Sequence, residues 1–100
     1  MQKSVEDFIQ KYKLQTNETT RYMDLVSEIG ELGKEILKST NYGKNDFTNN
    51  MSIADEIGDC VFSLLALCSE LNIDAHEALN TSLAKYESRF SKTHDIGSSE

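Results

Sequence analysis

The sequence contains no proline and no tryptophan, and only two of its 100 residues are cysteines. Without proline, no backbone position is barred from the interior of a helix. No uncharged apolar run approaches the roughly 18 residues that cross a bilayer, and the N-terminus lacks the apolar region of a secretory signal. Cys60 and Cys68 share one apolar run, which indicates buried thiols rather than a disulfide or a zinc site. We therefore expect a cytoplasmic protein without a membrane span.

Basic residues are scarce as well. The chain has 10 Lys and Arg against 17 Asp and Glu, which gives a net charge of −7, and the basic residues form no cluster. Such a chain repels DNA, RNA and anionic membranes, so a nucleic acid polymer or a membrane is not expected as a partner. The apolar residues, 38% of the chain, are concentrated in periodic stretches, which favours one folded domain with an acidic surface.

The spacing of the apolar residues is helical throughout, and β-branched residues do not alternate as they would in strands. We expect an all-α, four-helix, bundle-like domain over residues 1–90, followed by a polar, frayed tail at 91–100. Ser52, Asp74 and a Thr near residue 20 are the expected N-caps. The predicted helices are 5–14, 20–38, 52–71 and 75–90.

The third predicted helix is apolar on nearly all sides between Cys60 and Cys68. A single neighbouring helix cannot cover such a surface. Either this helix lies at the centre of the bundle, or part of it faces a second subunit. Because a 100-residue domain also buries a modest share of its surface, we expect a homodimer or a dimer of dimers.

Two short acidic spacings stand out within the predicted helices. Glu28 and Glu31 occur in S-E-I-G-E-L, and Glu56 and Asp59 occur in D-E-I-G-D. In each pair the acids lie three residues apart, on one face of a helix. If the second and third helices run antiparallel, the two pairs meet and offer four hard oxygen ligands. Such a set is typical of a Mg²⁺ site, with Mn²⁺ as a possible substitute.

These residues resemble the MazG-like all-α nucleotide pyrophosphohydrolases, whose signature is E-E-x-x-E followed later by E-x-x-D. Ser27-Glu28-Ile29-Gly30-Glu31 and Glu56-Ile57-Gly58-Asp59 fill the two places, and Lys85-Tyr86-Glu87-Ser88-Arg89-Phe90 is similar to the family's K-F-x-x-R-F ending. The resemblance covers about Asp24 to Phe90. It departs from the family at one position, because Ser27 stands where the first acid of the doublet is expected.

The resemblance implies a function and a role for each matching residue. The activity would be Mg²⁺-dependent hydrolysis of a nucleoside triphosphate, with a deoxynucleotide favoured, to the monophosphate and pyrophosphate, in nucleotide-pool housekeeping. The metal ligands and catalytic residues would be Glu28, Glu31, Glu56 and Asp59. Lys85 and Arg89, one turn apart, are placed to bind substrate phosphates. Glu31 or Glu56 would also orient the attacking water.

Two other metal sites that use acidic residues do not fit the sequence. A di-iron bundle needs Glu-x-x-His pairs, which neither His76 nor His94 completes. An EF-hand is excluded because the polar segment 45–50 lacks a ligand ladder ending in Glu. The remaining alternative is a helical oligomerisation or nucleotide-binding module of the same fold without catalytic activity.

Overall fold

The computed structural model describes residues 1–93, which form four α-helices and no β-strand: α1 (Gln2–Lys11), α2 (Glu18–Ser39), α3 (Met51–Glu70) and α4 (Ala75–Thr93). The predicted all-α class and the number of helices are confirmed. The first helix begins at Gln2 instead of residue 5, and the last reaches Thr93, so the first three residues of the predicted tail are helical. The rest of that tail lies outside the described residues. No helix of residues 1–93 is long and apolar enough to cross a membrane.

Helices α2, α3 and α4 begin at side-chain caps, two of which differ from those expected. The Oδ1 atom of Asn17 accepts a hydrogen bond from the N–H of Thr20 (2.8 Å), and that of Asn50 accepts one from Ile53 (3.1 Å). Both asparagines have extended backbones, as N-caps require, so α2 and α3 begin earlier than a Thr or Ser cap would allow. Asp74 caps α4 as predicted, by accepting a hydrogen bond from the N–H of Glu77.

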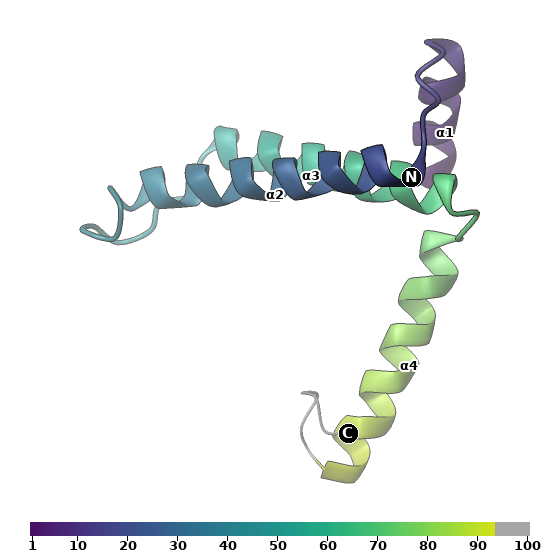
Figure 1. Ribbon diagram of the computed structural model, residues 1–100. Coiled ribbons are helices and arrows are strands. Elements are labelled where there is room, and N and C mark those ends of the chain that lie inside the picture. The colour runs from purple at the N-terminus through teal and green to yellow at the C-terminus, as the bar shows by residue number, and fades with distance from the viewer. Residues whose placement is uncertain (94–100) are drawn as a thin grey trace.

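The four helices are arranged around one antiparallel pair. Helices α2 and α3 lie side by side along their length, and α1 packs across the C-terminal part of α3 (Figure 1). The rings of Phe8 and Phe62 meet edge to face at 5.8 Å in this second contact. Helix α4 leaves the end of α3 at a steep angle and extends away from the other three (Figure 1). The bundle is therefore not completed within one chain.

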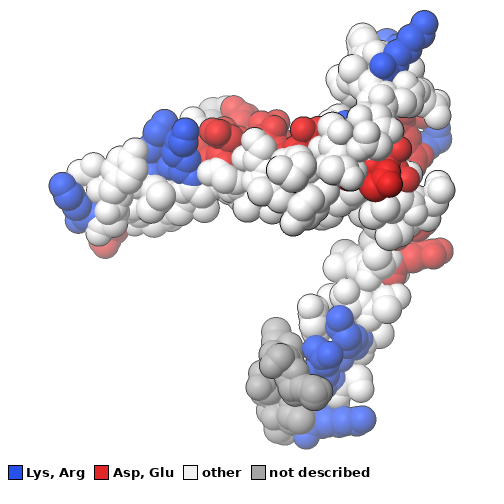
Figure 2. All heavy atoms as spheres, viewed as in Figure 1, with Lys and Arg blue, Asp and Glu red and all other residues white. Residues whose placement is uncertain are grey.

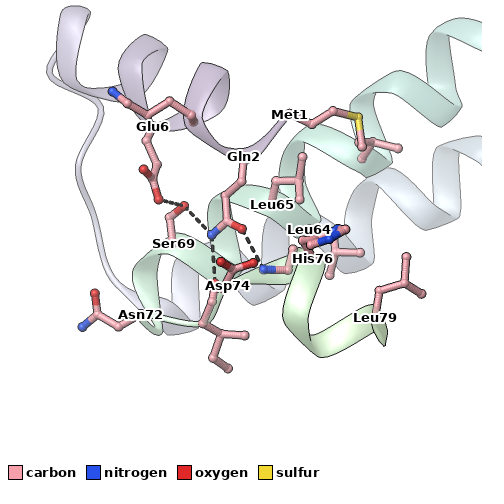
Figure 3. A pocket seen from close by; sticks show the side chains of 14 residues that line it. Met1, Gln2, Glu6, Leu64, Leu65, Ser69, Asn72, Asp74, His76 and Leu79 are labelled. Atoms are coloured by element: carbon pink, nitrogen blue, oxygen red, sulfur yellow. Dashed lines mark hydrogen bonds between the residues drawn. The ribbon is translucent and has the colours of Figure 1, made fainter. Parts of the chain in front are cut away.

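The direction in which α4 leaves is fixed by the side chain of Gln2 (Figure 3). Its Nε2 donates hydrogen bonds to Ser69 Oγ (3.2 Å) and to the carbonyl of Ile73 (2.8 Å), and its Oε1 accepts one from the N–H of Ala75 (2.8 Å). Ser69 in turn donates to Glu6 of α1 (2.8 Å). These bonds tie the first turn of α1 to the turn between α3 and α4.

The apolar core is small for a chain of this length. Within residues 1–93 only four apolar side chains are buried, which are Ile9, Ile53, Leu65 and Ala66. The radius of gyration is 16.8 Å, whereas a compact 100-residue domain has about 13 Å. Much of the apolar surface of the helices is therefore left without a neighbour in the single chain.

Candidate metal centre

The acidic site is built by the contact between α2 and α3. The residues of α2 that are shielded from solvent recur every three or four positions along the helix. They include two glutamates, Glu28 and Glu35, at positions that an amphipathic helix normally fills with apolar residues. On α3, Glu56 and Cys60 are half-buried at the same spacing. Helices α2 and α3 are antiparallel neighbours (Figure 1), and their contact brings Glu28 and Glu56 together.

Three of the four predicted carboxylates come together there. One oxygen each of Glu28, Glu56 and Asp59 can be chosen so that all three lie within 4.8 Å of one another. Glu28 and Glu56 are half-buried, whereas Asp59 is exposed. We call these three residues the acid group. Within residues 1–93 no Lys or Arg forms an ion pair with any of them.

The crowding of negative charge changes the titration of the neighbouring groups. Burial raises the pKa of the Glu56 carboxyl, and the charges of Asp59, Glu28, Glu31 and Glu35 raise it further. Burial likewise raises the pKa of the Cys60 thiol, followed by the charges of the acid group. Both shifts show that the site favours a less negative state, which protonation or a bound cation would supply.

The donor set fits a small divalent cation. All three side chains offer hard carboxylate oxygens, the ligands that Mg²⁺ and Mn²⁺ prefer. Two ligands on opposite sides of a Mg²⁺ ion are about 4.2 Å apart. Of three ligands only one pair can lie opposite, and adjacent ligands are about 3 Å apart. The oxygens of the acid group, within 4.8 Å of one another, therefore have to close by up to about 2 Å, which requires rotation of their side chains.

The other predicted site residues lie outside the acid group. Glu31 is exposed on the flank of α2, yet it is near enough for its charge to raise the pKa of Glu56. Lys85 and Arg89 are on α4, which points away from the α2–α3 pair, so the chain does not bring them to its own acid group (Figure 1). Their predicted roles are taken up below.

Two residues beside the acid group were not among the predicted metal ligands. Glu35 is half-buried, pairs with Lys38 at 3.5 Å and adds to the negative field at Glu56. Its spacing of seven residues from Glu28 places both on the same side of the helix, and this spacing was the available signal. Cys60, expected as an ordinary core thiol, lies beside the acid group, and both cysteines are free thiols.

Comparison with known proteins identifies a family for the chain. Residues 15–94, which are 80 of the 100 residues, match the model of the MazG nucleotide pyrophosphohydrolase domain. The match spans α2, α3 and α4 and therefore includes the whole acid group. The comparisons with curated proteins and with solved structures gave no match. The chain belongs to the MazG nucleotide pyrophosphohydrolase domain family.

Proposed function

We propose that this protein is a Mg²⁺-dependent nucleoside triphosphate pyrophosphohydrolase, which converts a triphosphate, with deoxynucleotides as the favoured class, to the monophosphate and pyrophosphate. The observation that carries the proposal is the acid group on facing sides of α2 and α3, within the stretch that matches the family. We place the activity in nucleotide-pool housekeeping in the cytoplasm, where the two cysteines would remain reduced.

Glu28, Glu56 and Asp59 would hold the metal. A divalent cation bound there supplies charge neutralisation for the phosphates and a more acidic bound water. The protein has to provide this neutralisation because its net charge of −7 otherwise repels a polyanionic substrate. Mn²⁺ has the same preference for oxygen ligands and is the expected substitute.

Three residues outside the acid group would orient the water and bind the phosphates. Glu31 is exposed on the same side of the pair but lies outside the group of three, which supports a role in orienting the water. The water oxygen bonds to phosphorus, the anhydride bond between the α- and β-phosphates breaks, and pyrophosphate leaves with that bond's electron pair. A carboxylate accepts the proton of the water. Lys85 and Arg89 would bind the phosphates, and Arg89 can do so with a two-pronged contact.

A second candidate is a helical oligomerisation or nucleotide-binding module of the same fold that has no catalytic activity. It is favoured by one observation, the many exposed large apolar side chains on α2, α3 and α4. Such surfaces mark an association site whether or not the protein catalyses a reaction.

Product analysis separates the two candidates. The purified chain is incubated with Mg²⁺ or Mn²⁺ and a panel of ribo- and deoxynucleoside triphosphates, and the products are resolved by anion exchange. We expect monophosphate and pyrophosphate in equal amounts and no diphosphate. If no nucleotide yields pyrophosphate with either metal, the enzyme proposal is wrong and the module remains.

A further inference from the structure

Two lysines lie on the α2–α3 pair beside the acid group. Between residues 22 and 74 the only Lys or Arg residues are Lys34, Lys38 and Lys44, and Lys44 belongs to the segment that connects the two helices. Figure 2 shows cationic side chains on the pair directly next to the acidic ones, between that segment and the junction with α1. These cations are therefore Lys34 and Lys38, which we call the lysine pair.

The lysine pair lies on the same side of α2 as the acidic residues. Glu31 directly precedes the half-buried Leu32. Lys38 directly precedes the half-buried Ser39 in the same way. One residue is a rotation of 100°, so Glu31 and Lys38 are turned to the same side of the helix. Lys34 follows Glu31 by three residues, which places it one turn further along and about 60° further around.

The lysine side chains lean toward the acid group. Every Cα–Cβ bond of a helix is tilted toward the helix N-terminus, and Glu28 lies on that side of both lysines. The Nζ atom of Lys38 is 3.5 Å from Oε2 of Glu35. Glu35 is half-buried, and its charge reaches Glu56. This contact therefore points the ammonium group of Lys38 back along α2 toward the acid group.

The surroundings of the acid group carry more negative charge than one metal ion offsets. Four other carboxylates place their charge close enough to Glu56 to raise its pKa, namely those of Asp59, Glu28, Glu31 and Glu35. With Glu56 itself these are five carboxylates, and a divalent cation offsets two of their charges. A polyphosphate that approaches them is still repelled. Its binding therefore requires cations of the protein in addition to the metal.

The other cations of the described chain are placed elsewhere. Helix α3 contains no Lys or Arg. Arg21, the remaining cation of α2, is buried, and its Nη2 donates a hydrogen bond to the carbonyl of Leu14 (2.6 Å). Helix α4 carries Lys85 and Arg89 away from the pair (Figure 1). Within residues 1–93, the lysine pair is thus the positive charge that the chain places along its own acid group.

Both lysines are available to a ligand. The side chains of Lys38 and Glu35 are 53% and 22% exposed, and exposed ion pairs contribute little to stability. Lys38 can therefore exchange Glu35 for a phosphate at little cost. Lys34 is exposed and forms no ion pair within residues 1–93. A lysine binds phosphate as a point charge on a flexible stem, which suits both positions.

The spacing along α2 matches a polyphosphate that is held at one end by the acid group. At 1.5 Å per residue, Lys34 lies about 4.5 Å beyond Glu31 and Lys38 about 10 Å beyond it. In the proposed reaction the bond that breaks joins the α- and β-phosphates and lies at the acid group. When the other phosphates extend toward the C-terminal end of α2, they come within reach of Lys34 and then of Lys38.

We infer that the lysine pair binds the β- and γ-phosphates of the substrate, so that the triphosphate lies along α2 with its end toward the segment between α2 and α3. The inference rests on the proposed function and adds two substrate-binding residues to it. Lys34 meets the β-phosphate, and Lys38 meets the γ-phosphate in place of Glu35. Pyrophosphate consists of these two phosphates, so both lysines hold the leaving group.

Calorimetric titration with inorganic pyrophosphate tests the lysine pair without catalysis. The protein is held in saturating Mg²⁺, and the Kd of pyrophosphate is measured for the wild type, Lys38→Gln and Lys38→Arg. Loss of a hydrogen bond between charged groups should raise the Kd about tenfold or more in Lys38→Gln. Lys38→Arg keeps the charge and should stay close to the wild type. A wild type that does not bind pyrophosphate, or an unchanged Kd in Lys38→Gln, overturns the inference.

Lys11→Gln is the matched control for this titration. Each lysine lies in the last turn of a helix, Lys11 in α1 and Lys38 in α2, so both substitutions remove one charge at an equivalent place. Lys11→Gln should leave the Kd of pyrophosphate nearly unchanged, because salt screens its charge at the distance of α1. An equal loss in both variants would mean that Lys38 acts through the net charge of the protein, which contradicts a direct contact.

Ligands of different length locate the contact. A nucleoside monophosphate lacks the two phosphates assigned to the lysine pair, so its Kd should be the same in Lys38→Gln as in the wild type. Among α,β-methylene analogues, which are not cleaved at that bond, the triphosphate should lose more affinity than the diphosphate in Lys38→Gln. Both analogues should lose affinity in Lys34→Gln. Equal losses for all three ligands in Lys38→Gln overturn the assignment of Lys38 to the end of the triphosphate.

A purely structural role of Lys38 is separated by its effect on the fold. A cation in the last turn stabilises a helix through its dipole, and this role requires no ligand. Circular dichroism should show nearly wild-type unfolding of Lys38→Gln, and if that variant does not fold, the pyrophosphate Kd of Lys34→Gln, which should also rise, decides the inference. If the wild type releases no pyrophosphate from any triphosphate, the proposed function fails, whereas the titrations still decide whether the lysine pair binds pyrophosphate.

Discussion

Glu28→Gln should weaken metal binding while leaving the helix pair in place. Glu28 is half-buried between α2 and α3, and its carboxylate is one of the three within 4.8 Å. Glutamine has almost the same shape but no charge, so two carboxylates remain. Removing a group that only supports a metal ligand typically costs 10–100-fold in affinity. Loss of a ligand should therefore cost about 100-fold or more.

The predicted size of the effect follows from the linkage between binding and stability. At a Mn²⁺ concentration 100 times the wild-type Kd, the metal stabilises the folded protein by about 2.7 kcal/mol, whereas a variant with a 100-fold higher Kd gains only about 0.4 kcal/mol. For a domain of this size, that difference of about 2.3 kcal/mol corresponds to roughly 10–18 °C in the metal-induced rise of Tm. The assay is thermal unfolding followed by circular dichroism, with and without Mn²⁺ and at fixed protein concentration.

Asp24→Asn is the matched control for this measurement. Asp24 lies on the same helix one turn before Glu28, but it is exposed and outside the acid group. The same loss of charge there should leave the metal-induced rise of Tm nearly unchanged. If Glu28→Gln responds to Mn²⁺ as the wild type does, or if Asp24→Asn loses as much, the acid group is not the metal site.

Three further predictions concern stability. Because the pKa of Glu56 is higher in the folded than in the unfolded protein, the metal-free fold binds its proton more tightly. Its unfolding free energy should fall as pH rises from about 4.5, and Mg²⁺ should abolish the trend in urea titrations. Gln2→Ala removes three hydrogen bonds and should lower the unfolding free energy by about 3 kcal/mol. The control is Lys3→Ala, which removes only an exposed ion pair. If Gln2→Ala lowers the unfolding free energy no more than Lys3→Ala does, α1 does not anchor α4. Asn50→Ala removes the cap of α3 and should cost about 1 kcal/mol in the same assay, and an unchanged midpoint would contradict that role.

The sequence predicts the helices well because their apolar residues are periodic, and it predicts their pairing less well. Leu25, Ile29, Leu32 and Ile36 recur at helical spacing in the second helix, which predicts a single apolar stripe. In the structure Leu25 and Leu32 are half-buried, whereas Ile29 and Ile36 are exposed. A stripe this wide serves two contacts on adjacent sides of the helix, and periodicity alone does not divide it between them.

The acid group could be predicted from the sequence because it follows from the spacing of the acidic residues. The members of each acidic pair are three positions apart, and antiparallel pairing of the two helices brings Glu28, Glu56 and Asp59 together. The direction in which α4 leaves α3 could not be predicted from the sequence. It depends on Gln2, whose side chain bonds to residues about 70 positions away, and local sequence patterns carry no information on such contacts. For that reason the separation of Lys85 and Arg89 from the acid group of their own chain emerges only in three dimensions.

Pyrophosphate release as a function of free Mg²⁺ tests the proposed function most directly. The wild type and Glu28→Gln are supplied with the deoxynucleoside triphosphate that the product panel ranks first, and the initial rate is measured from chelated metal upward. We expect a wild-type rate that starts at zero and saturates with Mg²⁺, and a variant that needs about 100-fold more metal or stays inactive. A rate that does not depend on Mg²⁺, or equal curves for the two proteins, would contradict a metal-dependent pyrophosphohydrolase built on this acid group.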